Sequence, residues 1–596
     1  MAEQVITPDE ANTLAGLFRE RVSRSPEAIA YRFFDAINGV WTDYSWRSMA
    51  REVGRWQVAL AQEALEPGDR VAVMARNSRF WVMFDQAALG LGLVSVPLYT
   101  EDRADNVAYI LQDAGVKLLI IGGPPQWERL EKRLKKLRSL KRVITISKVN
   151  ENSDKRLRDL ASWLPQQSEP LRVLDIAPDS LATIVYTSGT TGQPKGVMLS
   201  HKNILSNAYG GLQTMPINER HVFLSFLPLS HTLERTIGYY LPMMAGSTVA
   251  HARSIPELAE DLQIIKPTAL ISVPRIYERV YARIKENLAS KPAVFRELFK
   301  LTVEVGWRRF EYMQGRAKRH PSIILWPLLK RLVADKITQR LGGNLRVAVS
   351  GGAAMPPDIS RIFLGLGVPI LQGYGLTEAS PVISVNRLHD NIPESIGTPL
   401  PGVEVEIGKD SELLVRGDNV MLGFWNRPEA TRAVMDEEGW LHTGDKARIE
   451  DGHIYITGRI KDIIVMSNGE KVSPDDMELA IASDTLFDYV LIIGEARPYL
   501  AALAVVNGVQ WQKFADENNF PVDSKNEKDV EGVLLKRIAE HLHEFPGYAQ
   551  VRRITCTEDD WSIDNGLLTP TLKVKRRQVH KKYNGHIENM YEGHMV

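Results

Sequence analysis

Short apolar runs alternate with helix-period patterns through most of the first 350 residues. Turn signals such as Pro67-Gly68-Asp69 bound the runs, which are too short to be helices and are rich in Val, Ile and Leu. Strands and helices that alternate in this way build parallel sheets covered by helices, so we predict an α/β fold. The strands expected on this basis are 70–74, 93–98, 117–121, 142–146, 269–273 and 345–349.

The pattern changes after about residue 400. Residues 403–407 and 412–416 alternate apolar and polar positions, which is typical of half-buried antiparallel strands and predicts a β-rich subdomain. Mixed α and β patterns follow Gly458. Ser473-Pro474-Asp475-Asp476 predicts a helix start with a hydroxyl cap, a first-turn proline and two acids at the positive end. Residues 489–493 and 501–506 predict a hairpin.

The run 186–196 concentrates hydroxyls, three glycines and Lys195 between two expected strands, 180–186 and 196–201. Glycines allow sharp turns that bring backbone N–H groups to an anion, while hydroxyls and a lysine add donors, so this loop suits a polyphosphate. A Walker P-loop is excluded, because Pro194 occupies the second glycine position and Gly196 follows Lys195. An ordinary polar turn would need only one or two glycines.

Composition limits the alternatives. A chain of 596 residues requires at least two domains. Its formal net charge of zero argues against a generic nucleic-acid binder. The single cysteine, Cys556, excludes an intrachain disulfide and fits a reducing compartment. We see no secretion signal and no apolar run long enough to span a bilayer, so we expect a cytoplasmic protein.

Three weaker motifs follow the loop. Glycines around Tyr374 would let a flat heterocycle lie against its ring, Thr377 offers a hydroxyl to phosphate, and Glu378 offers oxygens to Mg²⁺. The run 350–353 could be a plain tight turn. Asp445, in the run 441–445, could bind two sugar hydroxyls or could simply cap a turn.

Together and in this order, the motifs resemble the adenylate-forming superfamily of acyl-CoA synthetases, peptide-synthetase adenylation domains and luciferases. The matching runs are 186–195, 374–378, 441–445, 458–462 and 571–576. Within that superfamily the chain looks most like the long-chain fatty acyl-CoA synthetases, on the runs 224–235, 273–279 and 568–573 and a helical insertion at about 285–340. One departure is Leu572, because many members have glycine before the C-terminal lysine.

The resemblance implies a two-step reaction. A fatty acid and Mg-ATP would give acyl-AMP and pyrophosphate, and CoA would then displace AMP. The implied catalytic residues are Lys573, Thr377, Glu378 (which also helps to hold Mg²⁺) and His231, although His231 could equally be a buried structural histidine. The implied nucleotide-binding residues are Thr187, Ser188, Gly189, Thr190, Thr191, Gly192, Lys195, Gly351, Gly352, Ala353, Gln372, Gly373, Tyr374, Gly375, Thr377, Asp445 and Arg459.

The resemblance also implies the domain organisation. A large N-terminal domain (1–457), with its β-rich subdomain at about 400–457, would connect through a hinge (458–462, including Lys461) to a small mobile α+β domain (463–596). Ser467, Asn468 and Gly469 would line the CoA face of the small domain. A homodimer is common among such relatives.

Two hypotheses compete with this interpretation. One is an adenylating ligase for another carboxylic acid or for a carrier-protein thiol. The other is a non-catalytic relative that only binds acyl or nucleotide ligands, which would not need Lys195, Glu378, Asp445 and Lys573 together.

Basic amphipathic segments also suggest weak peripheral contact with the inner face of a membrane. One is the stripe Leu130, Leu134 and Leu137, which could equally pack on the core, and the other is the insertion, with Trp307, Arg308, Arg309, Trp326 and Lys330.

Overall fold

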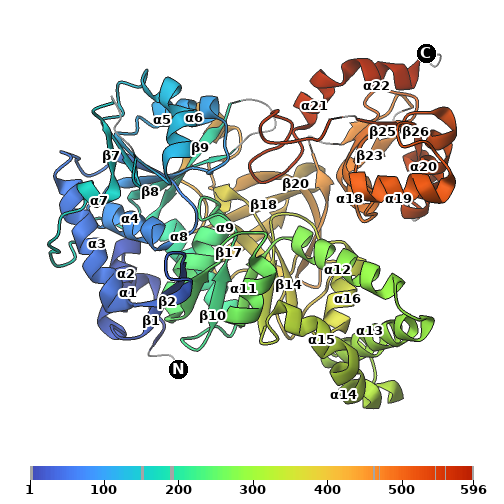
Figure 1. Cartoon of the computed structure of the whole chain (residues 1–596), viewed down its shortest axis with the longest axis horizontal. Coiled ribbons are helices and arrows are strands. Elements are labelled where there is room, and N and C mark those ends of the chain that lie inside the picture. Colours follow the sequence, from blue (N-terminus) through green and yellow to red (C-terminus); the bar gives the residue numbers. More distant parts are fainter. Residues whose placement is uncertain are drawn as a thin grey trace.

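The computed structural model describes residues 4–149, 154–187, 193–460, 463–468, 470–543, 545–557 and 559–592. Two large sheets form the N-terminal body, a small sheet lies beside them, and a separate lobe follows at upper right in Figure 1. All six strands expected in the first 350 residues form, within two residues of the expected bounds. The α/β fold class is confirmed.

The first large sheet has eight strands in the order β19-β9-β8-β4-β3-β5-β6-β7. Its central strands, such as β3 and β5, are largely apolar because both of their faces are covered. Alternate residues of β3 and β5 face α3 (Trp46–Ala61) and α4 (Arg79–Gly90) on one side, and α5 (Ala104–Asp113) and α6 (Pro124–Leu134) on the other. The strands are β3 Arg70–Met74, β4 Val94–Pro97, β5 Leu118–Ile121, β6 Arg142–Thr145, β7 Leu157–Asp159, β8 Leu181–Thr187, β9 Lys195–Ser200 and β19 Gly423–Phe424.

β8 and β9 pair antiparallel, so the hydroxyl- and glycine-rich loop connects two strands as predicted. Helix α8 (His201–Thr214) then begins after Ser200, whose hydroxyl accepts a hydrogen bond from the Asn203 N–H (3.1 Å).

The second large sheet has nine strands in the order β16-β15-β14-β13-β12-β10-β11-β1-β2. Helices α11 (Leu258–Ile265), α12 (Pro274–Ala289) and α16 (Pro357–Gly365) cover one face, and the central core, with α8 and α10 (Leu241–Ala245), covers the other. The strands are β1 Ile29–Asp35, β2 Val40–Ser45, β10 Val222–Ser225, β11 Thr248–His251, β12 Ala269–Ser272, β13 Val347–Ser350, β14 Ile370–Gly375, β15 Val382–Val385 and β16 Thr398–Pro399.

The β-rich region after residue 400 is an antiparallel four-stranded sheet, β17-β18-β20-β21, as the alternating pattern predicts. Its strands are β17 Val403–Ile407, β18 Glu412–Gly417, β20 Leu441–Glu450 and β21 His453–Arg459.

The last lobe is built on β24 (Phe487–Ile493), β25 (Leu500–Val506) and β26 (Val551–Cys556), with the expected hairpin formed by β24 and β25. A short pair, β22 (Ile464–Val465) and β23 (Lys471–Val472), precedes it. Helix α18 (Pro474–Ala482) begins after Ser473, but the Ser473 side chain accepts no cap hydrogen bond, so the expected hydroxyl cap is wrong. The other helices of the lobe are α19 Gly508–Asn518, α20 Lys528–His541, α21 Arg576–Lys582 and α22 Asn584–Tyr591.

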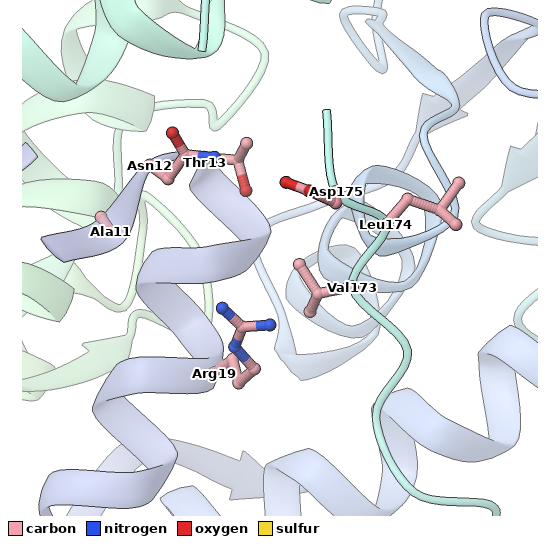
Figure 2. A pocket seen from close by; sticks show the side chains of 7 residues that line it. All are labelled: Ala11, Asn12, Thr13, Arg19, Val173, Leu174 and Asp175. Atoms are coloured by element: carbon pink, nitrogen blue, oxygen red, sulfur yellow. The ribbon is translucent and has the colours of Figure 1, made fainter. Parts of the chain in front are cut away.

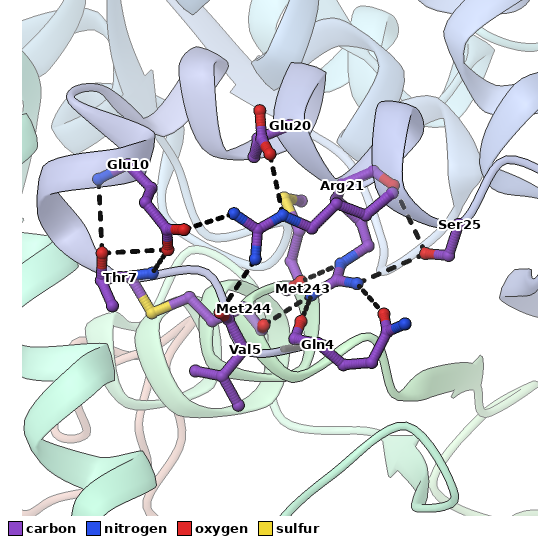
Figure 3. Close-up of polar contacts among 10 residues, drawn as sticks. Gln4, Val5, Thr7, Glu10, Glu20, Arg21, Ser25, Met243 and Met244 are labelled. Atoms are coloured by element: carbon purple, nitrogen blue, oxygen red, sulfur yellow. Dashed lines mark hydrogen bonds and ion pairs between the residues drawn. The ribbon is translucent and has the colours of Figure 1, made fainter. Parts of the chain in front are cut away.

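The N-terminal segment is fastened by arginines (Figure 3). Arg21, in α2 (Leu14–Arg24), is fully buried and donates to the carbonyls of Gln4 (2.6 Å), Met243 (2.9 Å) and Met244 (2.6 Å). Burial lowers the pKa of the Arg21 guanidinium to about 10, so it stays charged at neutral pH. A small opening of about 250 Å³ lies nearby, between α1 (Pro8–Ala11), α2 and the segment 173–175 (Figure 2), and contains none of the predicted site residues.

The helical insertion lies at lower right in Figure 1. Its helices are α13 Ala293–Met313, η3 Pro321–Leu325, α14 Trp326–Leu329, η4 Lys330–Ala334, α15 Asp335–Thr338 and η5 Gln339–Leu341. Helix α13 packs closely on α16 at Gly306. A Cβ added there would lie only 1.7 Å from the Gly365 carbonyl oxygen. The insertion is therefore fixed to the body through a backbone contact that only glycine permits.

The prediction that the stripe of Leu130, Leu134 and Leu137 faces lipid is wrong. Leu130 and Leu134 are fully buried and Leu137 is 8% exposed, because this stripe packs against the eight-stranded sheet. No helix among the described residues combines the length and apolarity needed to cross a bilayer.

Candidate active site

The small sheet holds Asp445 opposite Arg459. They are partners in the β20–β21 ladder, and the Arg459 Nε lies 3.0 Å from Asp445 Oδ1. The Tyr374 hydroxyl, from β14, donates a short hydrogen bond to Asp445 Oδ2. Three predicted nucleotide-binding residues are thus brought together from two sheets, with Asp445 only 3% exposed.

Burial and neighbouring charges shift the pKa values of Asp445 and Tyr374. Burial raises the pKa of Asp445, and the charge of Arg459 opposes the shift. Burial and the neighbouring Asp445 raise the pKa of Tyr374 well above its usual value, so its phenol stays protonated. Each carboxylate oxygen has a further lone pair to offer, so Asp445 can still accept hydrogen bonds from a vicinal diol.

Two glycine-containing segments lie side by side next to Tyr374. Ser350 of β13 pairs with Gln372 of β14, and Gln372 Oε1 accepts a hydrogen bond from the Met355 N–H (3.2 Å) across the loop that contains Ala353. A Cβ on Gly351 would lie 3.7 Å from the Gly373 carbonyl oxygen. These predicted adenine-framing residues therefore form one surface.

The backbone geometry explains why two positions in this region are occupied by glycine. Gly352 has a φ of +79°, in the left-handed region that favours glycine. A Cβ on Gly375 would lie 1.9 Å from the Pro381 carbonyl oxygen, so no larger residue fits that turn.

The phosphate end of the site lies at Lys195 and Glu378. Lys195 is the partner of Thr187 in the β8–β9 ladder, and its Nζ lies 5.2 Å from the centre of the Phe424 ring. Burial raises the pKa of Glu378, while Arg459 and Lys195 lower it and Asp445 raises it further. Lys195, Glu378, Asp445 and Arg459 therefore belong to one electrostatic cluster. Ser188, Gly189, Thr190, Thr191 and Gly192 lie outside the described residues.

Lys573 reaches this cluster from the last lobe. Loss of solvation and the charge of Arg459 lower its pKa, whereas Asp445 raises it. Burial and the charge of Lys573 lower the pKa of His231 to about 4. As a whole residue, Lys573 is nevertheless exposed. Lys573 thus lies within electrostatic range of His231, Asp445 and Arg459.

His231 is neutral at pH 7 and has a defined tautomer. Its Nδ1 accepts a hydrogen bond from the Leu233 N–H (3.2 Å), which leaves the proton on Nε2. His231 is the N-cap of the short helix α9 (Thr232–Arg235), which contributes two residues that sequence reasoning missed. Thr232 Oγ1 lies 3.5 Å from Thr377 Oγ1, and Leu233 lies 3.2 Å from a Cβ built on Gly351. Their adjacency to His231 was the available signal.

The predicted hinge and CoA residues are only partly described. Lys461 and Gly469 lie outside the described residues. Ser467 donates its N–H to the Arg497 carbonyl (3.0 Å), which joins it to the connection between β24 and β25, and Asn468 Oδ1 accepts from the Glu470 N–H (3.0 Å) within the β22–β23 turn. Their role toward CoA stays a prediction.

Comparison with known families decides the relationship. The profile of the AMP-binding enzyme family matches residues 18–425, and that of the AMP-binding enzyme C-terminal domain matches residues 461–595. The chain belongs to the family of AMP-binding enzymes. The resemblance to the adenylate-forming superfamily is therefore confirmed.

Relatives of this AMP-binding enzyme extend over nearly its whole length. It is 29% identical to the long-chain-fatty-acid–CoA ligase FadD15 of Mycobacterium bovis, over 98% of both chains. It is 28% identical to the chloroplastic long-chain-fatty-acid–[acyl-carrier-protein] ligase AEE15 of Arabidopsis thaliana, over 92% of this chain and 82% of that protein. The anthranilate CoA ligase AuaEII, solved with anthranoyl-AMP, shares the fold with a TM-score of 0.74, at 19% identity over 97% of this chain and 98% of that one.

The donor set of this AMP-binding enzyme fits Mg²⁺ only in part. Within the described residues no group of three His, Cys, Asp or Glu side chains forms a complete protein cage. Mg²⁺ in phosphate sites keeps several waters and binds one or two carboxylates plus substrate phosphates. Glu378, in the electrostatic cluster with Lys195, has the chemistry for that single-carboxylate role.

Proposed function

We propose that the protein joins a long-chain fatty acid to CoA in two steps through an acyl-adenylate. Membership of the AMP-binding family supports activation by adenylation, and the similarity to FadD15 along the whole chain supports a fatty acid and CoA as substrates. The single observation that supports the proposal most is that Lys573, from the last lobe, interacts electrostatically with His231, Asp445 and Arg459.

The chemistry needs activation because a carboxylate is a poor electrophile. In the first step a carboxylate oxygen attacks the α-phosphorus of ATP, the bond to the bridging oxygen breaks, and pyrophosphate leaves with the electron pair. Asp445 would hold the ribose hydroxyls, and Tyr374 with Gly351, Gly352 and Ala353 would frame adenine. Positioning and charge stabilisation supply most of the acceleration in transfers of this kind.

Two side chains from different lobes would stabilise the negative charge at the α-phosphate. Thr377 would donate a hydrogen bond to a phosphate oxygen, and the ammonium of Lys573 would bridge the carboxylate and α-phosphate oxygens. Neutral His231 would donate from Nε2 near the carboxylate. Mg²⁺, held by Glu378, would neutralise phosphate charge when bound.

In the second step the CoA thiolate attacks the acyl carbonyl carbon, and AMP leaves with the electron pair of the mixed anhydride. The hinge at 458–462 would absorb the backbone rotation that turns the last lobe between the steps. Ser467, Asn468 and Gly469 would then line the CoA path.

A carrier-protein acceptor is the second candidate, favoured by the similarity to AEE15. Pyrophosphate release should be measured with a panel of fatty, aryl and short-chain acids, followed by thioester formation with CoA and with an acyl carrier protein that bears a free phosphopantetheine thiol. We expect pyrophosphate release with long-chain acids and thioester only with CoA. Release with aryl acids alone, or thioester on the carrier protein alone, would support the alternatives. No nucleotide consumption with any acid would leave only a binding role.

A further inference from the structure

The helical insertion exposes an unusual share of the large apolar side chains. Of the 22 such side chains that are exposed among the described residues, nine lie in the segment 291–340. Single exposed apolar residues are normal on a soluble protein, but clustered ones mark a surface that contacts something. The nine are Val294, Phe295, Leu301, Tyr312, Met313, Ile324, Leu325, Leu328 and Leu332.

Four of them lie along one helical run, from η3 to η5. Trp326 and Leu329 are 7% and 4% exposed, because they pack inward with α13. Ile324 and Leu328 are 76% and 58% exposed, and Leu325 and Leu332 are 43% and 44% exposed. Spacings of three and four residues place Leu325, Leu328 and Leu332 on one side. The run is therefore apolar on two sides, a pattern typical of a helix covered on both.

The aromatic residues that the sequence suggested for this role lie elsewhere. Trp326 is buried under the Arg309 guanidinium, which lies 5.5 Å from its ring centre. Trp307 is covered in the same way by Arg361, at 5.4 Å. The aliphatic side chains, rather than the tryptophans, form the open face.

The insertion is strongly basic in a chain that has no net charge. Residues 291–340 contain twelve Lys or Arg and four Asp or Glu, a formal net charge of +8. Each of the four acids already pairs with a base: Glu297 with Lys300, Glu304 with Arg308, Glu311 with Arg316 and Asp335 with Lys330.

Two unpaired bases border the open face. Within the part of the chain that the structure describes, Arg331 and Lys336 form no ion pair. Arg331 is next to Leu332, and Lys336 follows Leu332 by four residues, on the same side of the helix. The apolar face thus has a cationic edge.

An anionic bilayer satisfies both features. Apolar side chains of a basic amphipathic helix enter the boundary between headgroups and acyl chains, while lysines and arginines meet the anionic headgroups. A second copy of this chain would not, because a symmetric contact would place one strongly basic insertion against another.

We propose that the face formed by Ile324, Leu325, Leu328 and Leu332, with its edge of Arg331 and Lys336, docks on an anionic lipid bilayer. The backbone contact between Gly306 and Gly365 fixes this face to the N-terminal body, so docking orients the whole protein. The proposal does not depend on which acid the protein activates.

The test is sedimentation of the full-length protein with vesicles at about 0.15 M salt, where distant charges are screened. We expect binding to vesicles of phosphatidylcholine mixed with phosphatidylglycerol and none to phosphatidylcholine alone. Leu328→Glu/Leu332→Glu should abolish binding. Arg331→Ala/Lys336→Ala should weaken it roughly 10- to 30-fold, from about 1 kcal/mol for each surface cation.

Matched controls change exposed residues elsewhere. Ile255→Glu/Ile264→Glu replaces two side chains that are each 48% exposed, and Lys141→Ala/Lys148→Ala removes two exposed cations. Both should bind like the unmodified protein. The proposal is overturned if the unmodified protein ignores anionic vesicles or if the controls lose as much binding as the test variants. It is also overturned if light scattering shows that Leu328→Glu/Leu332→Glu splits a lipid-free dimer.

Discussion

Thr569 and Lys573 close a five-residue loop on each other. The Thr569 N–H donates to the Lys573 carbonyl (2.8 Å), and the Lys573 N–H donates to Thr569 Oγ1 (3.0 Å). Inside this loop Leu572 has a φ of +61°, in the left-handed region. Many members of the adenylate-forming superfamily have glycine at this position. The left-handed backbone conformation gives a physical reason for glycine there.

Replacement of Lys573 should separate the two half-reactions. Lys573→Ala removes the ammonium that would stabilise charge at the α-phosphate, so we expect acyl-AMP formation to fall roughly 100- to 1,000-fold. Thioester formation from supplied acyl-AMP and CoA should change little. Pyrophosphate release measures the first step and thioester yield the second. Lys581→Ala, at an exposed position of α21, is the control. Equal loss of both steps in Lys573→Ala would contradict the role assigned to this lysine.

Substitutions at Leu572 should report on the loop itself. The left-handed conformation costs an ordinary residue roughly 1 kcal/mol, and glycine avoids this cost but loses about 0.5–1 kcal/mol of chain entropy. Leu572 is 43% exposed, so little burial is lost. Leu572→Gly should therefore keep the melting temperature and the rate of acyl-AMP formation near their original values.

Leu572→Val supplies the contrast. A β-branched side chain fits a positive φ badly, so we expect a loss of about 1–2 kcal/mol in the stability of the loop and slower acyl-AMP formation. Thermal melts and pyrophosphate release would show both effects. If valine and glycine behaved alike, the backbone at Leu572 would not limit the placement of Lys573.

Much of this architecture was predictable because it depends on local patterns. Strands β3 to β6 are mostly apolar, and the alternating runs 403–407 and 412–416 have the pattern of the half-buried antiparallel strands that they form. The connection of two strands through the loop before Lys195 was also predicted correctly, whereas the binding of an anion by that loop stays a prediction. These features are encoded over ten residues or fewer.

What the sequence could not supply were contacts between distant segments. The hydrogen bond from Tyr374 to Asp445 joins residues 71 positions apart, and the local sequence around neither residue indicates that the two are in contact. The stripe Leu130, Leu134 and Leu137 illustrates the same limit, because amphipathic spacing defines an apolar side without naming what covers it. Ser473 shows a smaller failure, in which the residue type suits a cap but its side chain makes no cap hydrogen bond.

A contact between the two parts of the chain offers a third test. Arg275, at the start of α12, donates to the Tyr489 hydroxyl (3.1 Å), and its guanidinium lies 5.1 Å from the centre of that ring. The contact joins the N-terminal body to β24 while Lys573 is at the site. Such a hydrogen bond and cation–π contact contribute about 1–2 kcal/mol together.

Arg275→Ala should therefore slow acyl-AMP formation roughly 5- to 30-fold and leave thioester formation from supplied acyl-AMP unchanged. Tyr489→Phe, which keeps the ring and loses the hydroxyl, should have a smaller effect. Arg283→Ala, at another position of the same helix, is the control. If both half-reactions slowed equally in Arg275→Ala, the contact would be structural and would not select one orientation of the lobe.

The buried acid Glu234 predicts how stability depends on pH. Glu234 is 1% exposed, and burial raises the pKa of its carboxyl from 4.5 to about 8. Between these values the folded state holds a proton that the unfolded state releases, so the contribution of Glu234 to stability falls as pH rises through this window. Below 4.5 the contribution is constant, because both states are protonated.

Glu234→Gln removes this titration. The free energy of unfolding of the variant, relative to the unmodified protein, should rise by up to about 1.4 kcal/mol for each pH unit between pH 5 and 7.5. Melting temperatures of both proteins across that range measure the difference. Glu437→Gln, at an exposed position, should show a difference that does not change with pH. A flat difference for Glu234→Gln as well would mean that Glu234 is already ionised in the folded protein, and that its burial is relieved by water or by a neighbour that moves.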